Sequence, residues 1–593
     1  MDGLPTTSMP QTAASLAMQV VCLQAELGAK QALVEQLTQE RDQLRVAYEA
    51  LRLELELLKR RLFVAKAERV DTEELKKEFG DKLAALDPLE AQLDQGEAEA
   101  PTPPPAAGSR PCGDGPRPPR RKPTGRRALH AASLPKERIE LTDPALEALC
   151  HSGQAERIGF EESHKLAWQR GGHRCLVIAR VKYRVVGTEP KPAELVTAPL
   201  PKELLSRCLA APSLLAHIAV DKYCDGLPLF RIQDRFARDG TSVDRGTMCR
   251  WLEDLGATCG ATVLTAARKE ALATAFCLAT DATGVLVQPL PTGTGTRQPC
   301  RRGHYFVQVA DEDYVFFEYT PKETSAAVGK LFHGFSGYVQ ADAKSVYDLL
   351  FVSPEERQKR RSEEEKDDPL DTAVRSEVGC WAHCRRKFWE AATTKNVVAR
   401  EGLYRIRRFF ELEAEWRSQV PARILQLRQQ RLRPHMESFF IWAAQEYAKV
   451  QNERGPLRTA LGYALRQQAP LLRPLEDGRL VLDNNRSERA LRSIAVGRKA
   501  WLFVGSDDHA AAAGHLLSLI ASARLHRLDP ESYLRDLFRV LAHWPQDRYL
   551  ELAPKYWART RARLDPGELL REVGSLTIPP PLAPTAPEQM SSR

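Results

Sequence analysis

Two aspartates stand in apolar stretches of this chain that read as β-strands. The run FCLATDATGVLVQ (residues 276–288) is predicted to be a strand with Asp281 in its middle. The run GYVQAD is predicted to be another strand, and it ends on Asp342. A strand core rarely tolerates a bare carboxylate, because its desolvation costs several kcal/mol unless a metal ion or another cation is present. We therefore expect a cation site at these two positions.

The elements around these aspartates follow a definite order. HYFVQVA and YVFFEYT are predicted strands, joined as a hairpin by a turn that contains Asp311 and Asp313. A short helix over residues 325–332 precedes the strand that ends on Asp342. The order strand, strand, strand, helix, strand, with acids in the first and fourth strands, indicates an RNase H-like sheet with a metal site. Asp348 is expected to lie in a following helix and to face solvent.

The stretch LDNNRSERALR contains a third acid, Glu488. Asp483 and the two asparagines after it are typical of a helix start, and Asp483 is expected to cap the helix rather than to bind metal. Leu491 and Ile494 would lie on the buried face of that helix. The residues alone leave open whether Glu488 is a solvated glutamate or a metal ligand with arginines beside it.

Residues 16–62 carry a heptad pattern. One register holds leucines from Leu16 to Leu58, broken only by Lys30, and the other runs from Val20 to Leu62, broken only by Arg41. Two apolar positions in seven over more than six heptads predict a coiled coil. Self-association is the favoured interpretation, and a long helix packed on its own chain is the alternative.

From about residue 98 to residue 125 the composition changes to Pro, Gly and Arg. Such a segment is predicted to be an extended linker. Its basic residues could neutralise DNA phosphates without reading sequence, or they could only keep the linker in solution. They are Arg117, Arg120, Arg121, Lys122, Arg126 and Arg127.

Composition limits the class of protein. The 593 residues, 43% hydrophobic and 28% charged, suit a soluble protein of several domains, and no apolar run is long enough to cross a membrane. The N-terminus lacks the features of a signal peptide. Twelve scattered cysteines favour reduced thiols in a cytoplasm. A net charge of +8 permits a nucleic-acid partner without requiring one.

The regions between these features are mainly helical. Residues 196–270 are predicted to be helical, with a helix, a turn containing Gly240 and a helix capped near Ser242, as in a helix-turn-helix or a plain bundle. VGCWAHCRRKFWEA is predicted to be a strand running into a helix, followed by helices over residues 396–475. GRKAWLFVGS is expected to be a turn, and two closing helices cover residues 510–525 and 529–542.

Several long motifs in this order resemble the transposases of the insertion-sequence-66 family. They are LKRRLFVAKAER, LPLFRIQDRFAR, DATGV, GYVQADAKSVY, GCWAHCRRKF, LDNNRSERALRSIAVGRKAWLFVGS and ARLHRLDPESYLRDLF. The resemblance covers residues 16–545. It implies a DNA transposase with an Asp-Asp-Glu site on an RNase H-like core, and it assigns that site to Asp281, Asp342 and Glu488.

The resemblance also implies a metal-dependent mechanism. Two Mg²⁺ ions, for which Mn²⁺ can substitute, would be held by the three acids. Asp281 would bridge the ions, Asp342 would hold one, and Glu488 would hold the other and orient the nucleophile. Water would first free a 3′-hydroxyl at the element's end, and that hydroxyl would then attack target DNA.

The implied partners are the terminal inverted repeats of the element, target DNA, a second copy through the coiled coil, and accessory proteins of the same element. We expect a bacterial cytoplasmic protein associated with the nucleoid and not with a membrane. Besides the linker, the candidate DNA contacts are His383, Arg385, Arg386, Lys387, Arg489, Arg492, Arg498 and Lys499. Trp381 and Trp501 are expected in the core.

The chain departs from the family in its zinc module. Only Cys150 survives of the first Cys pair, and the second pair is missing; Cys175 and His173 do not complete a finger. Cys380 and Cys384 also lack a matching pair. We therefore expect no structural zinc. Ala282 replaces a Glu that the family often has after the first aspartate, which leaves the ligand intact.

The expected fold is a multidomain α+β chain. It comprises a coiled coil (1–70), a charged helix end and basic linker (71–129), a degenerate zinc-finger-like module (130–195) and a helix-turn-helix-like module (196–270). An RNase H-like α/β core (271–395 and 476–545), interrupted by a helical insertion (396–475), and a tail (546–593) follow. The alternatives to a transposase are a non-catalytic DNA-binding regulator with a decayed core, and another RNase H-like nuclease.

Overall fold

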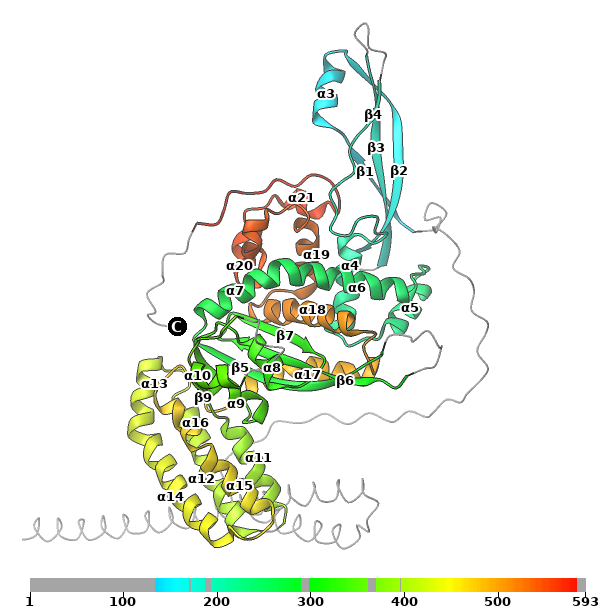
Figure 1. Cartoon of the computed structure of the whole chain (residues 1–593). Coiled ribbons are helices and arrows are strands. Elements are labelled where there is room, and N and C mark those ends of the chain that lie inside the picture. The colour runs from blue at the N-terminus through cyan, green and yellow to red at the C-terminus, as the bar shows by residue number, and fades with distance from the viewer. Residues whose placement is uncertain are drawn as a thin grey trace, which may run out of the picture. The chain divides into compact units, whose positions relative to one another are not determined.

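A computed structural model describes residues 134–583, apart from residues 170–171, 187–193, 290–297, 361–368 and 395 (Figure 1). The predicted coiled coil and the basic linker lie outside the described residues. The described residues up to 387 and from 401 on form one unit by their contacts, and this unit contains both sheets. In the described part, no helix has the length and apolar character needed to span a membrane.

The first sheet is built on one long strand, β3 (Gly172–Val185), which the apolar run from residue 175 to 186 predicts. β3 pairs in parallel with β1 (Lys136–Leu141), and antiparallel with β2 (Ala155–Gln169) and β4 (Glu194–Thr197). Helix α3 (Pro144–His151) connects β1 to β2 and begins at Asp143, whose carboxylate accepts hydrogen bonds from two helix amides. This arrangement is the mixed module expected here.

A helical segment follows the first sheet. It contains α4 (Pro212–Tyr223), α5 (Leu229–Arg238), α6 (Arg245–Cys259), a π-helical turn η2 (Gly260–Leu264) and α7 (Thr265–Thr274). The predicted helix, turn and helix correspond to α5 and α6. The cap of α6 is Asp244, two residues after Ser242 and thus near the predicted position, and its carboxylate accepts a hydrogen bond from the Gly246 amide at 2.8 Å.

The second sheet carries the two aspartates. Its strand order is β7-β6-β5-β8-β9, formed by β5 (Cys277–Val287), β6 (Arg301–Ala310), β7 (Tyr314–Thr320), β8 (Gly337–Gln340) and β9 (Arg375–Val378). β5, β6 and β7 are antiparallel, whereas β8 runs parallel to both β5 and β9. Helix α8 (Ser325–Leu331) lies between β7 and β8 in the chain. The predicted order of these strands and this helix is confirmed.

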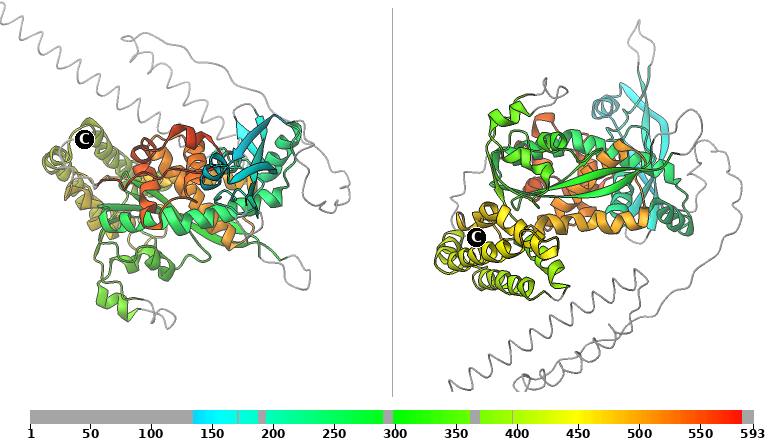
Figure 2. Two further views of the ribbon diagram at one scale, coloured as in Figure 1. Left: turned by 90° about the horizontal axis from the view of Figure 1, so that it is seen from above. Right: turned by 60° about the horizontal axis from the view of Figure 1, so that its bottom comes forward.

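Different elements cover the two faces of this sheet. Tyr305 and Gln308 on β6 point to opposite faces because side chains alternate along a strand. The Tyr305 hydroxyl donates to the carbonyl of Ala510 in α18 (Asp507–Leu525), whereas the Gln308 amide donates to the carbonyl of Leu331 in α8. Helix α17 (Asn485–Trp501) also contacts β5 and β6. Figure 2 shows these elements from two further directions.

Helix α18 protects the edge strand β7. The hydroxyls of Ser518 and Ser522 accept hydrogen bonds from the amides of Phe317 and Val315, at 2.8 and 2.9 Å. Helix α18 also packs on α6, where a Cβ on Gly256 would come within 2.2 Å of the Ala512 carbonyl oxygen. The glycine therefore permits the close approach of α6 and α18, and the covered edge cannot pair with another chain.

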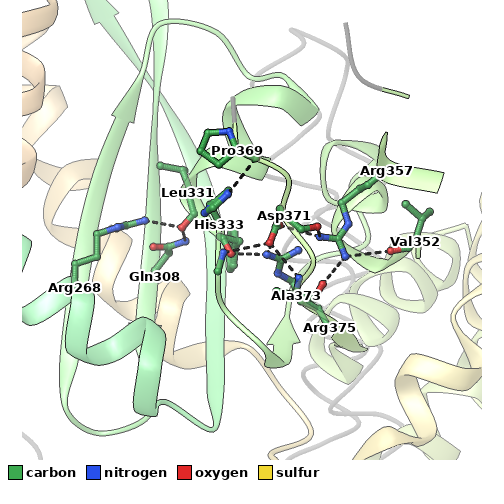
Figure 3. Close-up of polar contacts among 12 residues, drawn as sticks. Arg268, Gln308, Leu331, His333, Val352, Arg357, Pro369, Asp371, Ala373 and Arg375 are labelled. Atoms are coloured by element: carbon green, nitrogen blue, oxygen red, sulfur yellow. Dashed lines mark hydrogen bonds and ion pairs between the residues drawn. The ribbon is translucent and has the colours of Figure 1, made fainter. Parts of the chain in front are cut away.

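A buried cluster of two arginines and one aspartate anchors the other edge strand, β9 (Figure 3). The Asp371 carboxylate accepts hydrogen bonds from Arg375 at 2.5 Å and from Arg357 at 2.8 Å. Arg375 also donates to the Phe332 carbonyl, and Arg357 to the Ala373 carbonyl. Burial disfavours the Asp371 anion, but Arg375 and the backbone amides of Gly334 and Ala373 outweigh burial and hold the pKa of this carboxyl below its ordinary value.

The charged stretch that begins at residue 354 therefore differs from the solvated loop that its composition suggests. Its first residues form α10 (Pro354–Lys359), and Arg357 in that helix is buried. Short elements η3 (Ser345–Tyr347) and α9 (Asp348–Phe351) connect β8 to α10, and Asp348 is exposed as expected.

The segment between β9 and α17 is helical, as predicted (yellow in Figures 1 and 2). Trp381, at the start of α11 (Trp381–Ala392), is buried against Phe409, Phe439 and Phe440, which confirms its predicted place in the core. The other elements of this segment are α12 (Val397–Glu415), α13 (Pro421–Leu427), η5 (Arg428–Leu432), α14 (Arg433–Val450), α15 (Pro456–Arg466), α16 (Gln468–Leu472) and η6 (Arg473–Leu475).

Two predictions about the C-terminal part differ from the structure. Residues 497–501 were expected in a turn, but they form the last turn of α17, and the chain reverses at Leu502, which has a φ of 63°. Residues from 546 on were assigned to a tail. The described residues there include packed elements that follow α19 (Pro530–Val540), because Leu552 and Trp557 bury their side chains in the core. These elements are η7 (Gln546–Leu552), α20 (Pro554–Arg561) and α21 (Pro566–Leu570).

Replacing Asp371 tests the buried cluster. The substitution Asp371→Asn would leave two buried guanidinium groups without a countercharge, which costs about 3–5 kcal/mol in comparable buried pairs. We expect a lower urea midpoint. The matched control is Glu356→Gln, which removes a solvent-exposed partner of Arg360 and should change the midpoint little. Equal midpoints for the two variants would contradict this account of the cluster.

Candidate active site

Asp281 lies in the middle of β5, as predicted. It pairs with Val307 across the ladder with β6, so its side chain lies on the face that α17 and α18 cover. Burial raises the pKa of the Asp281 carboxyl above its ordinary value, and the nearby charge of Asp342 acts in the same direction. A hydrogen bond from the Ala282 amide and the positive charges of Lys344 and His383 oppose that rise.

Asp342 lies beside Asp281. The parallel pairing of β5 and β8 matches Ala279 with Gln340, and each aspartate comes two residues later. Neighbouring strands are about 4.8 Å apart, so the two carboxylates leave the sheet side by side. Ala343 follows with a φ of 54°, a conformation that costs a non-glycine residue free energy and turns the chain at once.

The Asp342 carboxylate is incompletely paired. Its side chain is only 10% exposed, and its Oδ1 atom is buried with no hydrogen-bond partner. The ammonium of Lys344 lies 3.6 Å from the other oxygen, Oδ2. The same ammonium lies 3.6 Å from the carboxylate of Glu323, which in turn lies 3.6 Å from His304. A buried carboxylate oxygen without a donor is suited to a cation.

Glu488 lies in the first turn of α17. The side chain is 27% exposed, and its Oε1 atom lies 3.6 Å from Nε2 of His383 in α11. His383 is also one of the positive groups that act on Asp281. The structure therefore brings together Asp281, Asp342, Lys344 and His383, with Glu488 in contact with the last of these.

The start of α17 differs slightly from the sequence expectation. The N-cap position is Asn484, and Asp483 precedes it. The Asp483 carboxylate nevertheless accepts a hydrogen bond from the Asn485 amide at 3.1 Å, so it satisfies one donor of the first helical turn. Near the end of the helix, Arg498 donates to the Thr283 hydroxyl and the Gly284 carbonyl, which ties α17 to β5.

The other basic residues near the acids differ in their exposure to solvent and in their contacts. Arg386, Arg489, Arg492 and Lys499 are exposed, and Lys387 is half-buried. Arg385 is exposed as well, but its guanidinium lies 5.5 Å from the centre of the Phe410 ring. Trp501 is only partly buried: it packs against the core, and the Lys222 ammonium lies 5.8 Å from its ring centre.

The cysteines of the expected zinc-finger-like module lie apart. Cys150 packs with Val181 and Tyr183, whereas Cys175 belongs to the large hydrophobic cluster of the unit. His173 is buried, and burial lowers its pKa to about 4. Burial raises the pKa of Cys380 to about 11 and that of Cys384 further. Cys380 and Cys384 are both buried.

Within the described ranges, no group of three or more His, Cys, Asp or Glu side chains is placed to enclose a metal ion. The residues present still fit a divalent cation, because Asp281 is half-buried with a raised pKa and Asp342 has a buried, unpartnered oxygen. Both offer the oxygen ligands that Mg²⁺ prefers.

The sequence analysis did not identify the pair Lys344 and Glu323 as part of the site. Lys344 lies within the motif GYVQADAKSVY, but nothing in the sequence links Glu323 to it.

Comparison with known proteins identifies the family. Residues 207–512 match the family described as Transposase IS66 family, and residues 518–554 match the IS66 C-terminal element. Residues 50–139 match a family described as Transposase C of IS166 homeodomain.

Relatives in Sinorhizobium fredii (strain NBRC 101917 / NGR234) are similar over most of the chain. The uncharacterized protein y4qI is 30% identical over 453 residues, which cover 74% of this chain and 78% of y4qI. The uncharacterized protein y4jD is 26% identical over 553 residues, 88% of this chain and 97% of y4jD. Because the first family match covers more than half of the sequence, and y4qI is similar along most of its length, this chain belongs to the IS66 family of transposases.

Proposed function

We propose that the chain is a DNA transposase that binds the ends of its own insertion sequence and cleaves and joins DNA strands. Asp281, Asp342 and Glu488 would hold the divalent metal ions of the reaction. The observation that carries this proposal is the position of the two aspartates, each two residues past the last pair of the parallel ladder between β5 and β8, with one buried carboxylate oxygen unpartnered.

The architecture supports the same function. Three antiparallel strands, a helix and a parallel fourth strand, in that order, are what an RNase H-like core requires, and we propose that the five-stranded sheet is such a core. Helix α17 then delivers Glu488 to the face that already carries Asp281. The coiled coil predicted over residues 1–70 would join two copies, so that two DNA ends can be held together.

The chemistry is an in-line displacement at phosphorus. When bound, divalent ions activate the attacking oxygen and stabilise the leaving oxygen. Asp281 and Asp342 contribute negative charge, and the Lys344 ammonium, 3.6 Å from Oδ2 of Asp342, offsets part of that charge. His383 lies against Glu488 and can hold or orient that carboxylate. The exposed arginines on α17 are suited to DNA phosphates.

The three acids are tested by isosteric substitution. Asp281→Asn, Asp342→Asn and Glu488→Gln should each lower Mg²⁺-dependent cleavage by more than about 100-fold, the upper range for loss of a group that only supports a metal ligand. DNA binding should persist. The assay uses labelled DNA from the gene's own flanks and follows 3′-end cleavage and strand transfer.

The matched control is Asp348→Asn, which changes an exposed aspartate six residues after Asp342. It should cleave like the wild type. Full activity in any of the three variants would remove that residue from the site. If the wild type binds its flanking DNA but does not cleave it, even with Mn²⁺ and accessory proteins, the chain is a DNA-binding regulator and not an active transposase.

The raised pKa of Asp281 predicts a pH dependence. A proton competes with the metal for this carboxylate, so cleavage at fixed Mg²⁺ should fall as the pH drops through a pKa above that of an ordinary aspartate. Lys344 lowers the pKa of Asp281, and Lys344→Gln should therefore move the acid limb of the rate profile to higher pH. Lys322→Gln, at an exposed lysine, is the control. If the acid limbs of the rate profiles of the wild type, Lys344→Gln and Lys322→Gln coincide, this electrostatic coupling is contradicted.

The exposed arginines of α17 make a separate prediction. If Arg492 contacts one phosphate, Arg492→Gln should weaken DNA binding to any sequence and reduce the slope of log affinity against log salt by about 1. Filter binding at several salt concentrations measures the slope. Arg360→Gln changes an exposed arginine directly after α10 and should leave the slope unchanged.

A further inference from the structure

Asn484 occupies the N-cap position of α17, but its side chain does not cap the helix. The residue is fully buried, and its side-chain amide donates to the backbone carbonyl of Thr280 at 2.7 Å. Its side-chain oxygen accepts a hydrogen bond from the Ser487 hydroxyl. The amide thus spans from the first turn of the helix to strand β5.

The acceptor on β5, the Thr280 carbonyl, has no strand partner on the side of β5 that faces β8. The ladder between β5 and β8 pairs Cys277, Leu278 and Ala279 with β8 and then stops, because β8 ends at Gln340. Thr280 is the next residue, and Asp281 follows it. The Asn484 amide supplies the hydrogen bond that the missing continuation of β8 would have supplied. An unsatisfied buried carbonyl would otherwise cost free energy.

The remaining bonds of Asn484 connect it to the other site residues. Its backbone carbonyl accepts from the Glu488 amide at 3.3 Å, so the two residues are one helical turn apart. Its backbone amide donates to Sγ of Cys380 at 3.2 Å, just before the helix that carries His383. One buried residue therefore bonds to the elements that carry Asp281, Glu488 and His383.

We infer that Asn484 is a positioning residue that fixes the height and rotation of α17 on β5, and so sets Glu488 opposite Asp281. This inference rests on the proposed function, since its purpose is the geometry of the metal-binding acids. Neither the resemblance nor the family match assigns such a role to Asn484.

The test is Asn484→Asp in the full-length protein. This variant keeps the oxygen that accepts from Ser487 but places an oxygen, instead of an NH₂ group, against the Thr280 carbonyl. The control is Asn485→Ala: the neighbouring asparagine donates only to the Asp483 carboxylate, at 2.6 Å, and does not reach the sheet. Three quantities are compared: DNA affinity, the cleavage rate at saturating DNA, and the rise in melting temperature on adding Mn²⁺.

We expect Asn484→Asp to bind DNA with wild-type affinity but to cleave it about 100-fold more slowly, as a misplacement of about 1 Å can cause. Its Mn²⁺ titration should shift to higher concentration. Asn485→Ala should match the wild type in all three quantities. Wild-type cleavage and Mn²⁺ response in Asn484→Asp would overturn the inference. A parallel loss of DNA affinity and stability would also overturn it, because that pattern indicates a purely structural residue.

A second variant covers the case in which Asn484→Asp does not fold. Ser487→Ala removes the hydroxyl that orients the Asn484 amide, and we expect a smaller fall in cleavage with a raised Mn²⁺ requirement. If the wild type itself cleaves no DNA, the proposed function fails. The positioning role of Asn484 is then tested only by the rise in melting temperature on adding Mn²⁺. Equal Mn²⁺ shifts in wild type and variants would overturn the positioning role.

Discussion

Asp281 places a carboxylate on a sheet face whose neighbouring side chains, Tyr305 and Val307, are buried and apolar. An ionised group in such a place is unstable unless other charges offset its desolvation. Here the offset is partial: Lys344 and His383 act on the carboxylate from nearby, while Asp342 acts against it. The negative charge of the site is therefore not fully offset by the neighbouring positive groups. The elements around it must stay packed although this charge disfavours the folded state.

Each edge strand of the sheet is fixed by its own set of contacts. On one side, the serines of α18 occupy the amides of β7, and on the other, Asp371 joins two arginines beneath β9. Between these fixed edges, the ladder of β5 and β8 is short, and it ends just before the two aspartates. The carboxylates thus lie just beyond the point where the pairing of the two strands stops.

Much of this arrangement could be predicted from local sequence. The strands around Asp281 and Asp342 are apolar runs bounded by turn residues, and the helices of residues 396–475 contain no strand signal. The end of α17 was predicted wrongly, because Gly497 resembles a turn residue. In the structure a Cβ there would lie 2.6 Å from Nε1 of Trp501, so the glycine makes room for that ring inside a helix.

Other features could not be predicted, because their partners are distant in the chain. Arg357 sits in a charged stretch typical of a solvated loop, yet it is buried by contacts with Asp371 and with backbone carbonyls. Glu323 lies near Lys344 only once α8 has packed. Asn484 resembles an ordinary helix cap, and its bond to Thr280 appears only when the helix lies on the sheet. These contacts depend on the tertiary structure. Local sequence pattern and secondary-structure propensity therefore do not predict them.

The bond between Asn484 and Thr280 joins residues 204 positions apart in the chain. Chains are synthesised at about 5–20 residues per second, so about 10–40 s separate the appearance of the two residues at the ribosome. During that interval β5 can form with β6 and β7, but no helix yet brings Glu488 to it. A nascent or truncated chain therefore lacks the assembled site. A chain that stops short of α17 cannot form this link between the helix and the sheet.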